Sequence, residues 1–309
     1  MTATLDGLII KAQSGFFTVH TEAGNFACQV RGKLKQRRLA SDLTAVGDRV
    51  TISTHADGAG MIEEIEPRRS ALSRRSPAGR DRVGPHSAAG EKEQVIVANP
   101  DQVVFVFAVA EPAPRLGMLD RFLVVAEASQ LPAVICFNKT DITSETRAQE
   151  MFSFYESLGY PVIYTSARNR RGLDALRERL RDRLSVLAGP SGVGKSSLLN
   201  ALQPGLGLAA KAISRATSKG RHTTVVPELL PLLFGGWVAD TPGLRALALF
   251  DIEPDEVDGY FVEIRPLVSQ CEFNDCTHLR ERGCAVQAAV ERGEIARSRY
   301  ESYRKLREL

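Results

Sequence analysis

The amino-acid sequence predicts a multidomain protein with an N-terminal β-barrel of the oligonucleotide-binding kind, a central α/β domain and a small helix-rich metal-binding domain. Residues 1–67 show short alternating apolar runs between turn signals, whereas near-continuous apolar strands alternate with amphipathic helices from residue 94. Four cysteine and histidine side chains cluster near the C-terminus. We therefore expect a barrel at 1–67, a basic linker at 68–93, the α/β domain at 94–250 and the metal-binding domain with a C-terminal helix at 251–309.

The composition is that of a folded protein outside the membrane. A chain of 309 residues with 43% hydrophobic and 25% charged residues can bury two or three cores. The first residues lack the pattern of a signal peptide, and no apolar run reaches the length of a membrane span. We expect a cytoplasmic monomer with no membrane partner.

Short runs of alternating apolar residues predict a barrel of about five antiparallel strands. The alternating residues are Phe17 and Val19, then Phe26, Cys28 and Val30, then Val50 and Ile52. A run of five cations at 31–39 would project from a loop between strands, and six arginines lie at 68–82. Both clusters can neutralise phosphates, which favours RNA as a partner of the barrel. The alternatives are solvated loops or linkers, and a barrel that binds protein or no partner.

The five cysteines fall into two groups. Cys28 and Cys136 stand alone in apolar runs, as small core residues do. The others lie in "CEFNDCTHLRERGC", whose possible ligands are Cys271, Cys276, His278 and Cys284. A disulfide would leave an odd thiol and would suit an oxidising compartment. Three thiolates and one imidazole instead complete a closed tetrahedral shell, which predicts one structural zinc ion.

The central region reads as strands joined by helices. Expected strands are "QVVFVFAVA", "PAVICFN", "PVIYTS", "SVLAG" and "GGWVAD", with helices at 118–130 and around 144–158. Strands without strict alternation predict a mostly parallel sheet covered on both faces. Ligands of such sheets bind beyond the carboxyl ends of the strands.

A phosphate loop follows one of these strands. "GPSGVGKSS" matches the eight-residue pattern, and its nucleotide-binding residues are Gly189, Ser191, Gly192, Val193, Gly194, Lys195, Ser196 and Ser197. Backbone amides can face the β-phosphate at a helix N-terminus, and the Lys195 ammonium supplies positive charge. The Ser196 hydroxyl can ligate Mg²⁺. A second strand leads into "DTPG", where Asp240 can hold Mg²⁺ through water and the Gly243 amide can meet the γ-phosphate.

A guanine-reading element lies upstream, in "FNKTD". Guanine presents two donors that adenine lacks, and the Asp141 carboxylate can accept both. Asn138 can bond the other edge of the base, and the stem of Lys139 can cover its face. A backbone amide of "TSA", at Ser166 or Ala167, can donate to the guanine carbonyl.

The motifs occur in an unusual order. The base-reading elements precede the phosphate loop, whereas an ordinary GTPase has them last. Joining the old termini and opening a surface loop would leave every strand in place. We therefore interpret the domain as a circularly permuted GTPase.

In this order, the motifs "GPSGVGKSS", "SKGRHTT", "DTPG" and "CEFNDCTHLRERGCAV" resemble the bacterial ribosome small subunit-dependent GTPases, the RsgA or YjeQ family, over essentially the whole chain. The resemblance implies a late assembly factor that binds the small ribosomal subunit and its rRNA and hydrolyses GTP to GDP when stimulated by the ribosome.

The resemblance also assigns roles to the switch residues. It implies that "SKGRHTT" is the first switch, with Thr223 or Thr224 closing on Mg²⁺ and the γ-phosphate. Leu244 stands where many GTPases have a glutamine that orients water, so the resemblance points to His222 for that catalytic role beside Lys195. An exposed histidine without catalytic duty is the alternative.

Two other classes of protein share part of the pattern. A phosphate-loop ATPase or kinase has no need for "NKTD" and "TSA". An RNA-binding protein with a vestigial nucleotide site has no need for an intact set of Lys195, Ser196 and Asp240.

Overall fold

The computed structural model describes residues 3–32, 44–54, 59–75, 93–206, 228–240 and 252–308. The expected switch at 218–224, with His222, Thr223 and Thr224, lies outside these ranges, as do Gly243 and most of the basic run at 31–39. The chain forms two compact units, made of residues 1–103, 173–188 and 195–246 and of residues 104–172, 189–194 and 247–309. No described helix has both the length and the apolar character needed to cross a bilayer.

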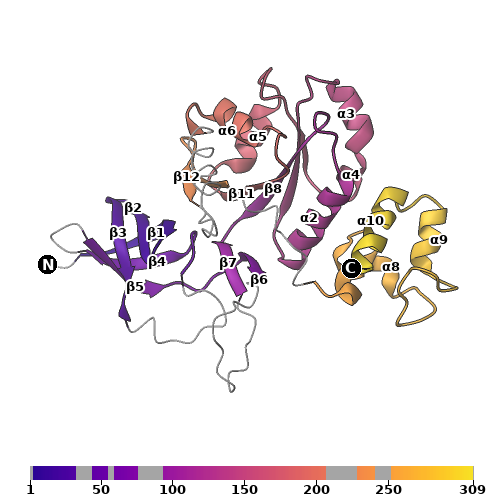
Figure 1. Cartoon of the computed structure of the whole chain (residues 1–309), viewed down its shortest axis with the longest axis horizontal. Helices are drawn as coiled ribbons and strands as arrows, with labels where there is room; N and C mark the ends of the chain where they lie inside the picture. The colour runs from indigo at the N-terminus through magenta and orange to yellow at the C-terminus, as the bar shows by residue number, and fades with distance from the viewer. Residues whose placement is uncertain are drawn as a thin grey trace. The chain divides into compact units, whose positions relative to one another are not determined.

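The N-terminal strands close into a five-stranded barrel in the order β1-β2-β3-β5-β4 (Figure 1). Its strands are β1 (Ala3–Gln13), β2 (Phe16–Thr21), β3 (Gly24–Val30), β4 (Arg49–Thr54) and β5 (Ala59–Ile65). Its core holds Val19, Cys28, Val50 and Ile52, as the alternation predicts. One expectation is corrected, because β3 and β5 pair in parallel. A closed ring with an odd number of strands cannot be antiparallel throughout.

Two further strands belong to the first unit. β6 (Ala71–Arg75) pairs antiparallel with β7 (Glu93–Ala98). Residues 71–75 therefore form a strand inside the range expected as a linker. Leu72 of β6 and its partner Val97 of β7 are 1% and 0% exposed. One face of this strand pair is therefore buried.

The central sheet has six strands in the order β10-β9-β8-β11-β13-β12. They are β8 (Gln102–Ala108), β9 (Ala133–Asn138), β10 (Val162–Tyr164), β11 (Leu184–Ala188), β12 (Leu229–Pro231) and β13 (Trp237–Asp240). β9 pairs in parallel with β10, and β11 pairs in parallel with β13. β8, β9 and β11 are buried at every position, which confirms the interpretation of unbroken apolar runs as covered strands. The edge strand β12 pairs antiparallel with β13.

Helices separate these strands along the chain. They are α2 (Leu116–Ala128), α3 (Glu145–Phe152), α4 (Phe154–Ser157), α5 (Leu173–Leu180) and α6 (Lys195–Leu202). The Ser144 side chain caps α3 by accepting from the Arg147 backbone N–H at 3.1 Å. Phe152 of α3 stacks on Phe137 of β9 with ring centroids 4.0 Å apart.

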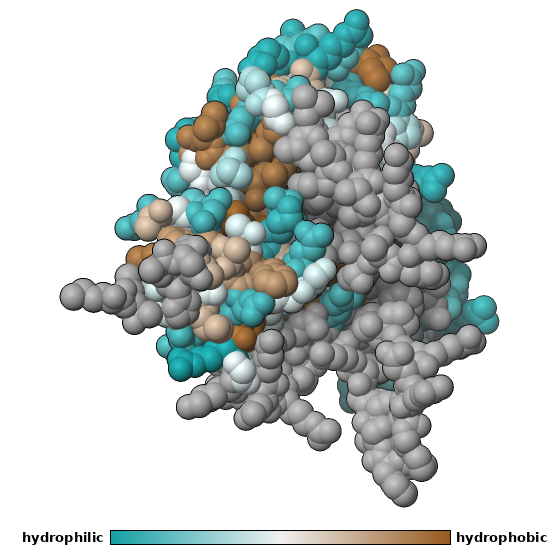
Figure 2. Space-filling model, turned by 60° about the vertical axis from the view of Figure 1, so that its left-hand side comes forward, coloured by the Kyte–Doolittle hydropathy of each residue, from teal (hydrophilic) through white to brown (hydrophobic). Residues whose placement is uncertain are grey.

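The C-terminal region belongs to the second unit and is helical. Its elements are the 3₁₀ helix η2 (Pro254–Tyr260) and the helices α8 (Arg265–Val268), α9 (Ala285–Glu291) and α10 (Arg297–Arg307). Phe261, Ile264 and Tyr303 share a core with Val124 of α2. α10 lies against α2 (Figure 1). In the view of Figure 2, apolar side chains are interspersed with hydrophilic ones. The exposed large apolar side chains of the described residues include Phe16 and Leu233.

Candidate nucleotide site and metal centre

Asn138, at the carboxyl end of β9, connects the predicted base reader to the phosphate loop. Its amide nitrogen donates to the Val193 carbonyl at 2.8 Å. Its amide oxygen accepts from the Thr165 hydroxyl and from the Ala167 backbone N–H, both at 3.2 Å. Asn138 is 1% exposed. One of its two amide N–H donors is thus used to hold the loop.

Two loop glycines, Gly189 and Gly194, have conformations and surroundings that exclude other side chains. Gly189 has φ +149°, and a Cβ there would lie 2.1 Å from the Val106 carbonyl oxygen. Gly194 has φ +95°, and its Cβ would lie 2.4 Å from the Asn138 amide nitrogen. A side chain at Gly194 would therefore strain the backbone and displace Asn138. Val193 is 1% exposed and faces the interior, whereas Ser191 and Gly192 are exposed.

Asp141 lies beside the "TSA" segment. One carboxylate oxygen accepts from the Ser166 hydroxyl at 2.6 Å, and the Ser166 oxygen in turn accepts from the Asn169 backbone N–H at 3.1 Å. The Asp141 side chain remains 11% exposed, and its second oxygen lies 4.0 Å from the Arg168 guanidinium. The Ser166 hydroxyl therefore fixes the orientation of the Asp141 carboxylate.

Lys139 reaches across the same region. Its ammonium donates to the Glu111 carbonyl. The residue has φ +67°, an uncommon conformation outside glycine. The structure thus brings Asn138, Lys139, Asp141, Ser166 and Ala167 together with residues 189–194.

The remaining residues predicted to bind phosphate belong to the first unit. Lys195 is the first residue of α6, and Ser196 and Ser197 follow in its first turn. β13 ends at Asp240, which pairs with Leu187 of β11. The carboxyl ends of β11 and β13 therefore lie at the same edge of the sheet, where α/β proteins bind ligands.

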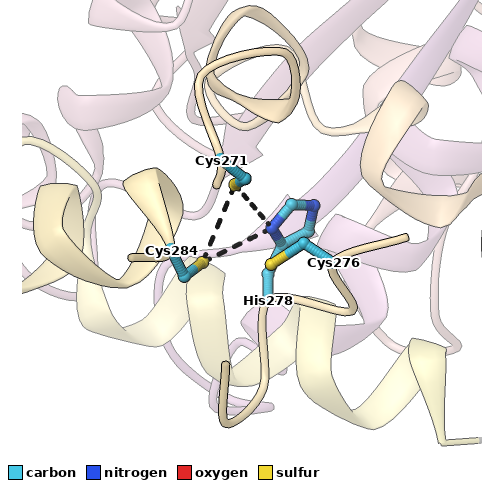
Figure 3. Close-up of side chains that lie close together, drawn as sticks. All are labelled: Cys271, Cys276, His278 and Cys284. Atoms are coloured by element: carbon cyan, nitrogen blue, oxygen red, sulfur yellow. Dashed lines mark hydrogen bonds between the residues drawn. The ribbon is translucent and has the colours of Figure 1, made fainter. Parts of the chain in front are cut away.

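The predicted metal ligands converge from four points of the C-terminal region (Figure 3). The ligand atoms of Cys271, Cys276, His278 and Cys284 all lie within 4.8 Å of one another. The His278 Nδ1 atom is 3.4 Å from the Cys271 sulfur and 3.5 Å from the Cys284 sulfur, and these sulfurs are 4.0 Å apart. A tetrahedral zinc shell with bonds of 2.0–2.3 Å separates its ligands by about 3.3–3.8 Å. The donor set and its spacing are consistent with a zinc module.

The surroundings of the cluster orient its ligands. The His278 Nε2 atom faces the Asp258 carboxylate at 3.3 Å, the arrangement that fixes a ligating imidazole. Cys284 caps α9, and its sulfur accepts from the Gln287 backbone N–H at 3.4 Å. Burial raises the pKa of the Cys284 thiol, and this hydrogen bond acts against that rise. Burial raises the pKa of Cys276 to about 12, and binding of a metal ion would release the proton of this thiol because the thiolate is the ligand.

Cys28 and Cys136 are each 0% exposed, which confirms their interpretation as core residues. Burial raises the pKa of the Cys28 thiol to about 11 and that of Cys136 to about 12. Both therefore stay protonated at neutral pH and behave as small apolar side chains.

The sequence-based prediction missed two acidic residues that make contacts within the second unit. Asp258 contacts His278 from 20 positions away, and Asp120 contacts Arg299 from 179 positions away. Asp258 lies in a stretch with other acidic residues, and Asp120 lies within the helix α2. No spacing rule distinguishes them from solvent-exposed acids.

Models of two protein families match the chain. The RsgA GTPase model matches residues 65–250, and the RsgA N-terminal domain model matches residues 6–62. The chain is 48% identical to the small ribosomal subunit biogenesis GTPase RsgA of Gemmatimonas aurantiaca, over 100% of this chain and 98% of that protein. The protein of the same name from Moorella thermoacetica is 43% identical, over 97% and 95%.

Two solved structures share the fold over nearly the full length. YjeQ from Thermotoga maritima superposes with a TM-score of 0.78 at 37% identity, over 99% of this chain and 98% of that chain. YloQ, described as a circularly permuted GTPase, superposes with a TM-score of 0.73 at 31% identity, over 99% and 94%.

Proposed function

The chain belongs to the RsgA family of GTPases, and from this premise we propose that it hydrolyses GTP to GDP in a late step of small ribosomal subunit maturation, stimulated by that subunit. The observation that carries the proposal is the Asn138 side chain. It bonds the phosphate loop through the Val193 carbonyl and the "TSA" segment through the Ala167 amide. One buried residue thus joins the two halves of a nucleotide site that the chain order separates.

In the proposed base site, the Asp141 carboxylate accepts the N1 and N2 donors of guanine. Its hydrogen bond from Ser166 supports this role because it fixes the orientation of the carboxylate. The free Asn138 donor bonds the opposite edge of the base, and the Lys139 stem covers a face. A backbone amide at Ser166 or Ala167 donates to the guanine carbonyl.

In the proposed phosphate site, the amides of Gly189, Ser191, Gly192, Val193 and Gly194 and the start of α6 face the phosphates. Lys195 neutralises the β- and γ-phosphates, with Ser197 beside it. Ser196 and Asp240 hold the Mg²⁺ that accompanies GTP, which spreads the charge of the transferred phosphoryl group. Gly243 meets the γ-phosphate, Thr223 or Thr224 closes on it, and His222 orients the attacking water because Leu244 cannot.

For the metal centre, we propose one zinc ion held by Cys271, Cys276, His278 and Cys284. Four protein ligands close the shell, so no position is left for a reacting water. Zinc therefore stabilises the fold of the C-terminal domain, which supports its use as a binding module.

The proposed partners are GTP and the small ribosomal subunit, with rRNA contacts made by the barrel and the metal-binding domain. The closed barrel and the basic run at 31–39 favour a polyanionic ligand. We expect binding to weaken as salt concentration rises.

The deciding experiment is single-turnover GTP hydrolysis with and without purified small ribosomal subunits. We expect a large stimulation that Lys195→Ala abolishes, together with GTP binding that ATP does not displace. His222→Ala should lower the stimulated rate without changing GTP affinity. Equal rates with and without subunits would refute the ribosomal role, and an unchanged rate for His222→Ala would remove His222 from the mechanism.

A further inference from the structure

The β12–β13 hairpin occupies a special place in the chain. Glu228, at its start, follows Thr224 of the expected first switch by four residues, and β13 ends at Asp240, the first residue of "DTPG". The hairpin therefore connects the two segments expected to respond to the γ-phosphate. The position of the hairpin therefore fixes the points at which the two expected switch segments join the described part of the chain.

The hairpin is also fastened to the elements that flank the phosphate loop. Gln203, next to the end of α6, accepts from the Leu233 backbone N–H at 2.8 Å and donates to the Pro231 carbonyl at 3.4 Å. The Trp237 backbone N–H donates to the Arg183 carbonyl at 2.8 Å, directly before β11. A hairpin held along both edges transmits a displacement as one body.

The barrel contacts this hairpin near both of its ends. The Lys11 ammonium of β1 lies 3.1 Å from the Glu228 carboxylate, and the two residues also form a backbone bridge. The His20 ring of β2 meets the Trp237 ring edge-on, with centroids 5.0 Å apart. A bulge between Ile9 and Lys11 interrupts the alternation of β1, and bulges of this kind redirect side chains.

Beside these contacts lies a cavity of about 460 Å³. Its lining is rich in charged side chains and includes Asp6, Glu22 and Arg49 from the barrel part of the chain and Asp182 and Arg183 next to β11. The barrel and the hairpin are therefore not joined here by a continuous apolar core. Discrete polar and aromatic contacts carry the connection, and such contacts can exchange partners.

We propose that Lys11 and His20 are positioning residues for GTP hydrolysis. Through Glu228 and Trp237 they set the position of the β12–β13 hairpin, so that RNA bound to the barrel changes the rate of hydrolysis. The Lys11 side chain is 43% exposed, and a polyanion can compete with Glu228 for its ammonium. This inference rests on the proposed function, because it names the route by which the subunit would act.

The test exploits a natural probe. Trp237 is the only tryptophan of the chain, so intrinsic fluorescence reports directly on the hairpin contact. Wild type, Lys11→Glu, Glu228→Lys and the double variant Lys11→Glu/Glu228→Lys are compared in single-turnover hydrolysis with saturating small subunits. Trp237 emission is recorded on addition of a non-hydrolysable GTP analogue with Mg²⁺, without subunits.

We expect each single variant to lower the stimulated rate about threefold to fivefold, the scale of one partly exposed ion pair, with GTP affinity unchanged. The double variant restores the pair in reverse and should return to within about twofold of wild type. The emission change on nucleotide binding should differ in the single variants and recover in the double variant. Lys11→Met should lower the stimulated rate in the same way without reversing a charge.

A matched control separates the contact from the overall charge. Lys11→Glu combined with Glu291→Lys, at an exposed position of α9, restores net charge but not the pair, and should show no recovery. Recovery equal to that of the reversed pair would overturn the inference. The inference would also be overturned if subunits stimulated the wild type and both single variants showed the same stimulated rate as the wild type. If small subunits do not stimulate hydrolysis by the wild type, the proposed function is refuted instead. The Trp237 emission then tests the inference by itself. Equal emission changes in the wild type and all variants would overturn the role of the Lys11–Glu228 contact.

Discussion

The Arg299 guanidinium donates to the Asp120 carboxylate at 2.8 Å, although 179 residues separate the two in sequence. Both side chains are 1% exposed. Arg299 also donates to both oxygens of Glu263, at 2.6 and 3.0 Å. Burial acts to lower the pKa of Arg299, but the two carboxylates raise it above its ordinary value. A fully paired buried charge thus attaches α10 to α2 within the second unit.

Removal of Asp120 should therefore be costly. Asp120→Ala leaves the Arg299 charge with one partner and takes the acceptor from the Tyr155 and Ser302 hydroxyls. We expect a loss of about 3–5 kcal/mol in the free energy of unfolding of the second unit, measured by urea denaturation. Arg147→Ala removes an exposed pair with Glu150 and should cost about 0.5 kcal/mol or less. Equal losses in the two variants would contradict the role of the buried pair.

Replacement of Asp141 should change which base is bound. Asp141→Asn loses an acceptor for the two guanine donors, so we expect GTP affinity to fall about 10- to 100-fold. Xanthine has a carbonyl in place of the guanine amino group, and the new amide can donate to it, so xanthosine triphosphate should bind better than GTP. Equilibrium titration with both nucleotides measures this. Asp174→Asn, at an exposed helix position, should leave both affinities unchanged. Retained GTP preference in Asp141→Asn would exclude Asp141 as the base reader.

Gly194 should tolerate no side chain, because its Cβ would displace the Asn138 amide. We expect Gly194→Ala to lower nucleotide affinity at least about tenfold, since the link between loop and base reader is lost. Gly205 has a similar φ of +87° but open space around a Cβ, so Gly205→Ala carries the backbone strain without the clash. Binding of fluorescent GDP compares the two variants. Equal affinities of the two variants would show that the contact between Gly194 and Asn138 does not control nucleotide binding.

Metal content should follow the cysteine cluster alone. We expect one zinc per chain by elemental analysis, and loss of the metal in Cys276→Ala, because three ligands no longer close the shell. Strong chelation should lower the unfolding temperature of the C-terminal domain. Cys28→Ala removes a buried thiol of the barrel core and should retain the zinc. Full zinc occupancy in Cys276→Ala would rule out the proposed ligand set.

The sequence predicted those features that depend on residues close together in the chain. Apolar runs located β8, β9 and β11, and the spacing of Cys271, Cys276, His278 and Cys284 identified a cluster that the fold brings together. Both signals depend on residues close in sequence. The same reasoning missed β6, because a short strand that buries few side chains has too weak a pattern.

The sequence by itself determined the fold class, the covered strands of the central sheet and the donor set of the cysteine–histidine cluster, since apolar runs and donor type act within a few residues. Only the tertiary structure decided which distant groups meet. It placed Asn138 against Val193, Arg299 against Asp120 and Lys11 against Glu228. The physical reason is that these contacts depend on how strands and helices pack across long chain separations. A polar side chain carries no local sign of the partner that packing will bring to it.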